Sequence, residues 1–208
     1  MEAASQFPSD VDAVVEAILA GLPVLLPTDT VYGLCVTAYR EEPARRLYRL
    51  KGRDRFQPTA LVATTVDMLF ECVPELRGRA GTVVRALLPG AYTLIVPNPG
   101  GRYRWLTGAS PETLGVRVPA LEGSAAEVLA RVATVAATSA NLPGEPDPRR
   151  LEDVPEELRA GCASVLDGGE LPGTPSTVID VTGDKPYVLR EGAGPVEEAL
   201  ERIRGALT

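Results

Sequence analysis

Short strand-like runs, separated in many places by helical patterns, constrain the fold of this chain more than any other feature of its sequence. Most of them are rich in β-branched residues and bounded by Gly or Pro, which is typical of strands. They occupy residues 22–26, 59–63, 92–96, 114–118, 134–138, 163–167, 176–181 and 187–190. Helices separate the runs in the first two-thirds of the chain, and the last runs follow one another closely. This order predicts one large, twisted, mixed parallel and antiparallel sheet with helices packed on it.

The helical patterns have recognisable ends. Ser9 is expected to cap the first helix, with Asp12 at the capping-box position and Gly21 as the stop. Pro43 stands where a second helix can start, and that helix would end at Gly52. Further helical patterns lie near residues 66–73, 79–88, 122–131 and 195–206. The expected fold class is therefore α/β, of the α+β type.

One segment resembles a domain boundary. The stretch "NLPGEPDPRR" at residues 141–150 is rich in Pro and polar residues. The strand-like runs beyond it nevertheless read as continuations of the same sheet. We therefore expect a single domain over residues 1–208, a length sufficient to bury a substantial core.

Composition excludes several kinds of site. The chain contains no histidine, which removes Ser-His and Cys-His triads and His-based zinc sites. Its three cysteines show no CxxC spacing and are expected to be free thiols in a reducing compartment. No apolar run approaches the roughly 20 residues that cross a membrane. The N-terminus is acidic and lacks a signal-like pattern, so we expect a cytoplasmic protein without a membrane partner.

The net charge of -7 is unevenly distributed. Residues 143–208 carry 14 acids and 7 bases, so the first 142 residues are neutral overall. Within that neutral part, residues 40–55 hold seven bases and three acids, and Tyr48 stands among them. A local cationic site is therefore compatible with an acidic protein. RNA binding by a basic groove is one reading of this segment, although the acidic total opposes a long polyanion.

Polar clusters recur at the ends of the apolar runs, where open sheets commonly hold their ligands. The first is the stretch "LLPTDTVYGL" at residues 25–34, in which a buried strand runs into two hydroxyls, a carboxylate and a phenol. A connecting turn alone does not need these side chains. The other clusters are "KGR" at 51–53, "TLGVRV" at 113–118, "TSAN" at 138–141, and "STV" and "LREG" at 176–178 and 189–192.

Each cluster also has a plain structural interpretation. Lys51 and Arg53 suit a phosphate clamp, but cations also favour the end of a helix. Arg117 stands between valines in an apolar run, so it requires either an anionic ligand or an internal ion pair with an acid such as Asp29 or Asp180. The "TSAN" hydroxyls and amide suit phosphate or ribose, and they also suit a polar turn.

The absence of several common catalytic and phosphate-binding motifs limits the chemistry that the site can perform. There is no GxxxxGK[ST] loop, no GxGxxG loop, no acid pattern with metal-ligand spacing, and no histidine to activate a serine. Hydroxyls, cations and amides remain. These groups bind an anion and stabilise developing charge, which favours phosphoryl or nucleotidyl transfer without a covalent intermediate.

In this order and at these spacings, "PTDTVYGL", "KGR", "GVRVP", "TSAN", "STVID" and "LREG" resemble the YrdC/Sua5 family of threonylcarbamoyl-AMP synthases. The match runs from about residue 9 to residue 205. The resemblance implies a single YrdC-like domain with a concave, positively charged groove. It also implies that the second C-terminal domain of the longer Sua5 type is absent. It also implies that L-threonine, bicarbonate and ATP give threonylcarbamoyl-AMP and pyrophosphate, the first step of threonylcarbamoyladenosine formation on transfer RNA.

The resemblance also implies roles for individual residues. Lys51 and Arg53 would stabilise the departing pyrophosphate, with Mg²⁺ brought by ATP and no metal ligand from the protein. The expected partners are the three substrates and the transferase machinery that modifies transfer RNA. The threonine pocket would comprise Thr30, Tyr32, Arg117, Ala137 and Ser176. The ATP site would comprise Lys51, Arg53, Thr113, Ser139, Asn141 and Arg190.

The chain departs from the family pattern at several places. After "KGR" the family commonly reads "NPLIVH", whereas this chain reads "QPTALVA" and lacks that histidine. "ATSAN" replaces "APSAN", and the loop before Ser176 is rearranged. A paralogue that handles another amino acid, carbamoyl or nucleotide substrate therefore remains an alternative.

Overall fold

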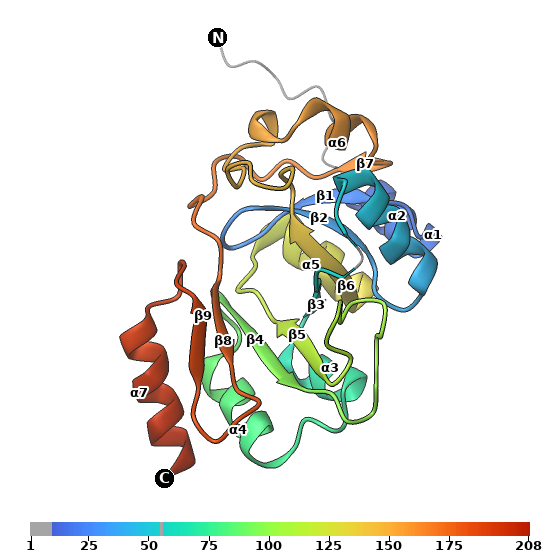
Figure 1. Ribbon diagram of the computed structural model, residues 1–208. Coiled ribbons are helices and arrows are strands. Elements are labelled where there is room, and N and C mark those ends of the chain that lie inside the picture. Colours follow the sequence, from blue (N-terminus) through green and yellow to red (C-terminus); the bar gives the residue numbers. More distant parts are fainter. Residues whose placement is uncertain (1–9, 55) are drawn as a thin grey trace.

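The computed structural model describes residues 10–54 and 56–208, and it contains one large sheet with helices packed around it (Figure 1). The helices are α1 (Val11–Ala20), α2 (Glu41–Lys51), α3 (Val66–Cys72), α4 (Gly78–Leu87), α5 (Gly123–Val132), the 3-10 turn η1 (Leu151–Asp153), α6 (Glu156–Ala160) and α7 (Val196–Leu207). The strands are β1 (Val24–Pro27), β2 (Tyr32–Thr37), β3 (Ala60–Ala63), β4 (Tyr92–Pro97), β5 (Thr113–Arg117), β6 (Thr134–Ser139), β7 (Ser164–Val165), β8 (Thr177–Asp180) and β9 (Tyr187–Arg190).

All nine strands form one sheet in the order β7-β1-β2-β6-β3-β5-β4-β8-β9. The pairs β1/β7, β3/β5 and β4/β8 are parallel, and the other neighbours are antiparallel. The mixed sheet with packed helices that the sequence predicts is therefore confirmed. The strands that follow residue 150 join this sheet at both of its edges, with β7 at one and β8 and β9 at the other.

Strand β2 was not predicted, and it corrects our interpretation of the opening motif. The polar stretch after Pro27 is a short connection between β1 and β2, not the end of strand structure in this region. The Thr28 hydroxyl accepts hydrogen bonds from the amides of Thr30 and Val31, at 3.2 Å each. All six residues of β2 are buried, because β1 and β6 flank the strand and hydrophobic clusters cover both of its faces, with Leu34 and Val36 in one cluster and Cys35 in the other. A strand buried on both faces shows no alternation of polar and apolar residues, which is why the pattern did not reveal it.

Two helix starts also differ from the prediction. Asp10, not Ser9, caps α1, and its carboxylate accepts the amides of Asp12 and Ala13. Ser9 lies outside the described residues. Helix α2 begins at Glu41, two residues before Pro43, so that Pro43 falls within the first turn where its missing N–H costs nothing. Helix α6 and the turn η1 were not predicted, and both are short.

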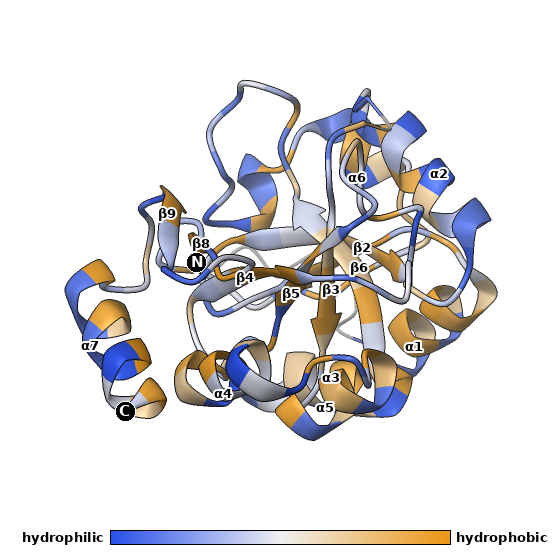
Figure 2. Cartoon of the chain, turned by 60° about the horizontal axis from the view of Figure 1, so that its bottom comes forward, coloured by the Kyte–Doolittle hydropathy of each residue, from blue (hydrophilic) through white to orange (hydrophobic). Residues whose placement is uncertain are grey.

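Two hydrophobic clusters hold the helices to the sheet. The smaller cluster joins α1 and α5 to alternate residues of β1, β2, β3 and β6, among them Cys35, Val62 and Val135. The larger one joins the intervening residues to α2, α3, α4, α6 and α7. Figure 2 shows hydrophobic residues concentrated in the middle of the molecule and hydrophilic residues on the outer turns of α2 and α7. Within the described residues, every helix is too short or too polar to span a bilayer.

Candidate ligand-binding cavity

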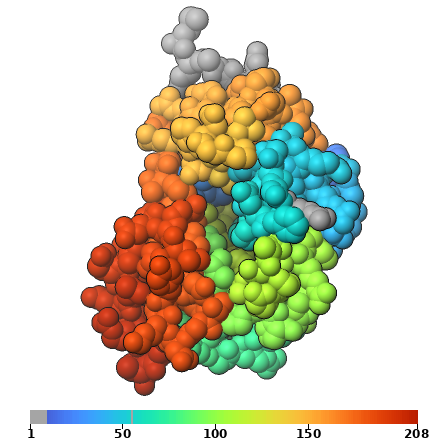
Figure 3. Space-filling view, viewed as in Figure 1, coloured from blue at the N-terminus to red at the C-terminus, as the bar shows by residue number. Residues whose placement is uncertain are grey.

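A cavity of about 340 Å³ lies against one face of the sheet, beside α5. Figure 3 shows a hollow on this side of the molecule, between the C-terminal segment and the segment that follows α2. The hollow exists because small residues lie side by side across four neighbouring strands. Cys35 on β2 is opposite Ala137 on β6, Ala137 is opposite Ala60 on β3, and Gly115 on β5 lies next to Ala60. Larger side chains at these positions would fill the space.

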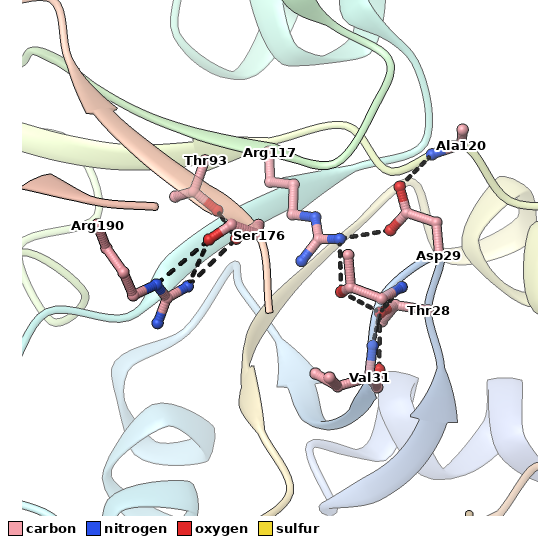
Figure 4. Close-up of polar contacts among 9 residues, drawn as sticks. Thr28, Asp29, Val31, Thr93, Arg117, Ala120, Ser176 and Arg190 are labelled. Carbon is pink, nitrogen blue, oxygen red and sulfur yellow. Dashed lines mark hydrogen bonds and ion pairs between the residues drawn. The ribbon is translucent and has the colours of Figure 1, made fainter. Parts of the chain in front are cut away.

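Arg117, at the end of β5, lines one side of the cavity (Figure 4). Its Nη2 donates to the Asp29 carboxylate and, at 2.9 Å, to the Thr30 hydroxyl. The other Asp29 oxygen accepts the amide of Ala120 at 3.0 Å. Burial lowers the pKa of Arg117, and the neighbouring Asp29 opposes that shift. Of the two structural interpretations offered for this arginine, the internal ion pair with Asp29 is therefore present.

The ion pair does not use all of the Arg117 donors. No residue in the described part of the chain accepts a hydrogen bond from Nη1, and the buried Nε also has no partner there. The guanidinium is therefore anchored by one nitrogen and keeps a donor for an anion in the cavity. An ion pair and a carboxylate-binding role are compatible at this position.

Arg190 and Ser176 continue this side of the cavity. The Arg190 guanidinium donates to the backbone carbonyl of Ser176 through Nε at 3.2 Å and Nη2 at 2.8 Å. The Ser176 hydroxyl is 2.8 Å from the hydroxyl of Thr93. Figure 4 shows the Arg117 and Arg190 side chains on either side of Ser176 and Thr93. The positive charge of Arg190 contributes to the lowered pKa of Arg117, as expected for two cations that share one cavity.

The second polar cluster of the site is organised around Lys51, the last residue of α2. Its ammonium, buried in the protein, donates to the Ser139 carbonyl at 2.5 Å and to the Thr138 hydroxyl and the Asn141 side-chain oxygen, both at 3.1 Å. Burial and the nearby Arg53 charge lower the pKa of Lys51 to about 8. The ammonium is therefore held by the "TSAN" segment and titrates close to neutral pH.

Arg53 meets Lys51 because of the glycine between them. Gly52 ends α2 in a left-handed conformation, φ 62°, and the chain changes direction there. Glycine adopts this conformation without the steric strain that a Cβ would cause. The Arg53 guanidinium then donates to the Thr138 hydroxyl at 2.6 Å and to the Pro58 carbonyl at 2.7 Å. Burial lowers the pKa of Arg53 as well. The "KGR" motif thus places two cations on one hydroxyl.

The cavity lining is cationic. Among the described residues it contains three charged side chains, Arg53, Arg117 and Arg190, and no acid. The cations on the body of α2 are compensated differently. Arg45 pairs with Glu41, and Arg46 and Arg49 pair with Glu42. The basic segment 40–55 therefore presents fewer free cations to a polyanion than its composition suggests. Lys51 and Arg53 have no acidic ion-pair partner among the described residues, and they lie beside the cavity and in its lining.

The predicted site residues fall into three groups. Those that line the cavity are Arg53, Arg117, Ala137, Ser139, Ser176 and Arg190. Thr30, Lys51 and Asn141 are outside the lining but bond directly to it or to its backbone. Thr113 begins β5, where its hydroxyl donates to the Ser110 carbonyl, and it does not reach the cavity.

Tyr32, like Thr113, is a predicted site residue that lies outside the cavity lining. It is fully buried, and its hydroxyl donates toward Asp167 and the Gly169 carbonyl and accepts the amide of Gly168. Burial is the main reason that its pKa is raised. The Tyr32 hydroxyl therefore anchors the segment after β7.

Four threonines that line the cavity were not among the predicted site residues, namely Thr28, Thr59, Thr93 and Thr138. Thr138 is the first letter of the "TSAN" motif, so the motif itself was the available signal. Thr93 carried no signal, because it sits in an ordinary strand pattern. Cys35 also lines the cavity, and burial raises its pKa to about 12. Its thiol is therefore neutral and unsuited to nucleophilic attack.

Known proteins share the sequence pattern and the fold of this chain. A family model described as "Telomere recombination", which covers Sua5, YciO and YrdC proteins, matches residues 16–192. The chain belongs to the Sua5/YciO/YrdC family. The family resemblance that the motifs predict is thereby confirmed.

Individual relatives give the same result. A threonylcarbamoyl-AMP synthase of Pyrococcus abyssi is 34% identical over 191 residues, which cover 91% of this chain and 56% of that protein. A putative threonylcarbamoyl-AMP synthase of Mycobacterium tuberculosis is 34% identical over 90% of this chain and 86% of its own length. The crystal structure of P. abyssi Sua5 complexed with L-threonine superposes with a TM-score of 0.84 at 33% identity, over 94% of this chain and 57% of that one. The chain thus spans little more than half the length of the P. abyssi protein.

Proposed function

We propose that this chain is a threonylcarbamoyl-AMP synthase, which converts L-threonine, bicarbonate and ATP into threonylcarbamoyl-AMP and pyrophosphate. One observation carries the proposal. A single cavity has an arginine with a free donor on one side, at Arg117, and a second cation in its lining, at Arg53, with Lys51 bonded to the lining beside it. An amino-acid carboxylate and a triphosphate require two such separate anion sites. Membership of this family supports the same assignment.

The chemistry needs no protein nucleophile. The threonine amine condenses with bicarbonate, with loss of water, to give a carbamate. A carbamate oxygen then attacks the α-phosphorus of ATP, and the bond to the β-phosphate oxygen breaks, so that pyrophosphate leaves. The carbamate is already anionic, which is consistent with a cavity that contains a neutral Cys35 thiol and no histidine base.

Each cluster has a distinct task in this proposal. Arg117 binds the threonine carboxylate through Nη1, and its anchorage to Asp29 and Thr30 fixes the direction of that donor. Ala137 and Ser176 line the space beside it. Lys51 and Arg53 face the phosphates and stabilise the charge that grows on the departing pyrophosphate. Ser139, Asn141 and Arg190 complete the ATP site.

Magnesium is expected to enter with the nucleotide. In the described residues no three His, Cys, Asp or Glu side chains are grouped so that they could hold a metal ion. Asp29, which bonds to the cavity residue Arg117, also accepts the amide of Ala120. The phosphates of ATP are therefore the ligands proposed for Mg²⁺. The product would pass to the transferase machinery that modifies transfer RNA.

The test is a substrate screen. The purified protein is incubated with ATP, Mg²⁺ and bicarbonate, and with each amino acid in turn, while pyrophosphate and a carbamoyl-adenylate are followed, the latter by mass spectrometry. We expect turnover to need threonine and bicarbonate together. Serine should be about 10- to 200-fold poorer, the usual discrimination for one missing methyl group. Turnover without any amino acid, or a strong preference for an unrelated one, would refute the proposal.

A further inference from the structure

Thr138 joins the two cations of the "KGR" motif, and this contact has no role in the reaction described above. The Thr138 hydroxyl oxygen accepts Lys51 Nζ at 3.1 Å and Arg53 Nη1 at 2.6 Å. A hydroxyl oxygen has two lone pairs, so these two donors use all of its acceptor capacity. Lys51 and Arg53 carry like charges, and the Arg53 charge adds to the burial that lowers the pKa of Lys51. The shared oxygen offsets the repulsion between the two charges and sets their spacing.

Thr138 is well placed to hold two mobile side chains. It lies on β6, with Leu34 of β2 directly opposite and with its neighbour Ala137 paired to Ala60 of β3. Lys51 and Arg53 reach it from the end of α2 and from the loop beyond Gly52. A strand residue in the middle of a sheet is a more rigid support than either a helix end or a loop. Thr138 and Arg53 both line the cavity, and Lys51 lies directly behind this lining, where it donates to Thr138 and Ser139.

We propose that Thr138 is a positioning residue, whose hydroxyl holds Lys51 and Arg53 at the spacing needed to bind a triphosphate and its departing pyrophosphate. This inference rests on the proposed function for its catalytic part, whereas its nucleotide-binding part is independent of the amino-acid substrate. Each cation also donates to other acceptors. Lys51 donates to the Ser139 carbonyl and the Asn141 side-chain oxygen, and Arg53 donates to the Pro58 carbonyl and the Gln57 side-chain oxygen. Thr138 is the one partner that the two cations share among the described residues.

The variants are chosen to isolate the hydroxyl. Thr138→Val keeps the shape and β-propensity of the side chain and removes the oxygen. Thr138→Ser keeps the oxygen. Thr82→Val is the matched control, because the Thr82 hydroxyl donates to the Gly78 carbonyl in α4, away from the cavity. Urea unfolding of each variant establishes that it is folded before any activity is compared.

Three measurements follow. The pyrophosphate assay should show kcat lowered about 10- to 100-fold in Thr138→Val, the scale of one lost hydrogen bond to a charged group, with Thr138→Ser and Thr82→Val near wild type. The pH profile of kcat/KM should also shift in Thr138→Val. A lysine that loses an acceptor of its charged form has a lower pKa, so the alkaline limb of Thr138→Val should begin at lower pH than that of wild type. A purely structural role would not move this limb.

The third measurement separates this inference from the proposed function. Isothermal calorimetry with α,β-methylene-ATP and Mg²⁺ should show weaker binding to Thr138→Val than to wild type, Thr138→Ser or Thr82→Val. If the wild type binds the analogue but makes no carbamoyl-adenylate, the proposed function fails, and the binding series still decides the role of Thr138. If an active wild type and Thr138→Val agree in kcat, pH limb and analogue binding, the positioning role is refuted. A wild type that neither turns over nor binds the analogue refutes both.

Discussion

Removal of Asp29 should destabilise the protein strongly, because Arg117 would keep a buried charge without its partner. The two side chains are 11% and 12% exposed, and the carboxylate also accepts the amide of Ala120. Breaking one partner out of a buried ion pair typically costs 3–5 kcal/mol. Arg117 borders a cavity that water can enter, so we expect Asp29→Ala to lower the free energy of unfolding by about 3 kcal/mol, the lower end of that range. For a chain of this length, such a loss lowers Tm by roughly 6–12 °C.

The assay is urea unfolding of single and double variants. Asp29→Ala combined with Arg117→Met removes both charges and should recover much of the lost stability, since apolar replacements of buried pairs are often nearly neutral. The control is Glu41→Ala, which breaks the exposed pair with Arg45 and should cost about 0–1 kcal/mol. A loss below about 1 kcal/mol in Asp29→Ala, or a double variant that is less stable than the single one, would contradict the reasoning given for this ion pair.

Three further predictions concern the cavity and its supports. Lys51→Ala should lower kcat by roughly two to three orders of magnitude. Wild-type kcat/KM should fall as pH rises through about 8, because the pKa of Lys51 lies there and the ammonium loses its charge above it. A flat profile of kcat/KM between pH 7 and 9 would oppose this prediction. Gly115→Val should abolish α,β-methylene-ATP or threonine binding measured by calorimetry, while stability in urea stays near wild type. A Cβ at Gly115 would be 3.5 Å from its nearest neighbour, Ile95, and the valine methyl groups would extend into the cavity. Tyr32→Phe should cost about 1–3 kcal/mol in urea unfolding, because the amide of Gly168 loses its buried acceptor; an unchanged midpoint would show that the anchorage is unimportant.

Much of the fold was predictable from local pattern. The strand-like runs and helical periods correspond to eight of the nine strands and six of the helices, since Pro, Gly and β-branched residues act on the backbone near them in the chain. Strand β2 was missed for the opposite reason. Its identity as a strand depends on β1 and β6 on either side, not on its own alternation.

The site was predictable as a set of residue types and not as a set of contacts. The motifs identified the arginines, the lysine and the hydroxyls, because the absence of histidine and of metal-ligand patterns left anion binding as the available chemistry. The sequence did not distinguish Tyr32, which anchors a neighbouring segment, from Ser176, which lines the cavity. It also left open whether Arg117 serves an ion pair or a ligand.

The sequence alone determined the element order, the family motifs and the kinds of charge available, because these depend on neighbours in the chain. Only the tertiary structure decided which side chains meet. Arg117 contacts Asp29 across 88 positions, and Lys51 contacts Thr138 across 87. Pairing of β6 with β2 and β3 brings the "TSAN" segment beside the end of α2, and the row of small residues leaves room for a ligand. Such contacts follow from strand register, and register is a property of the whole sheet.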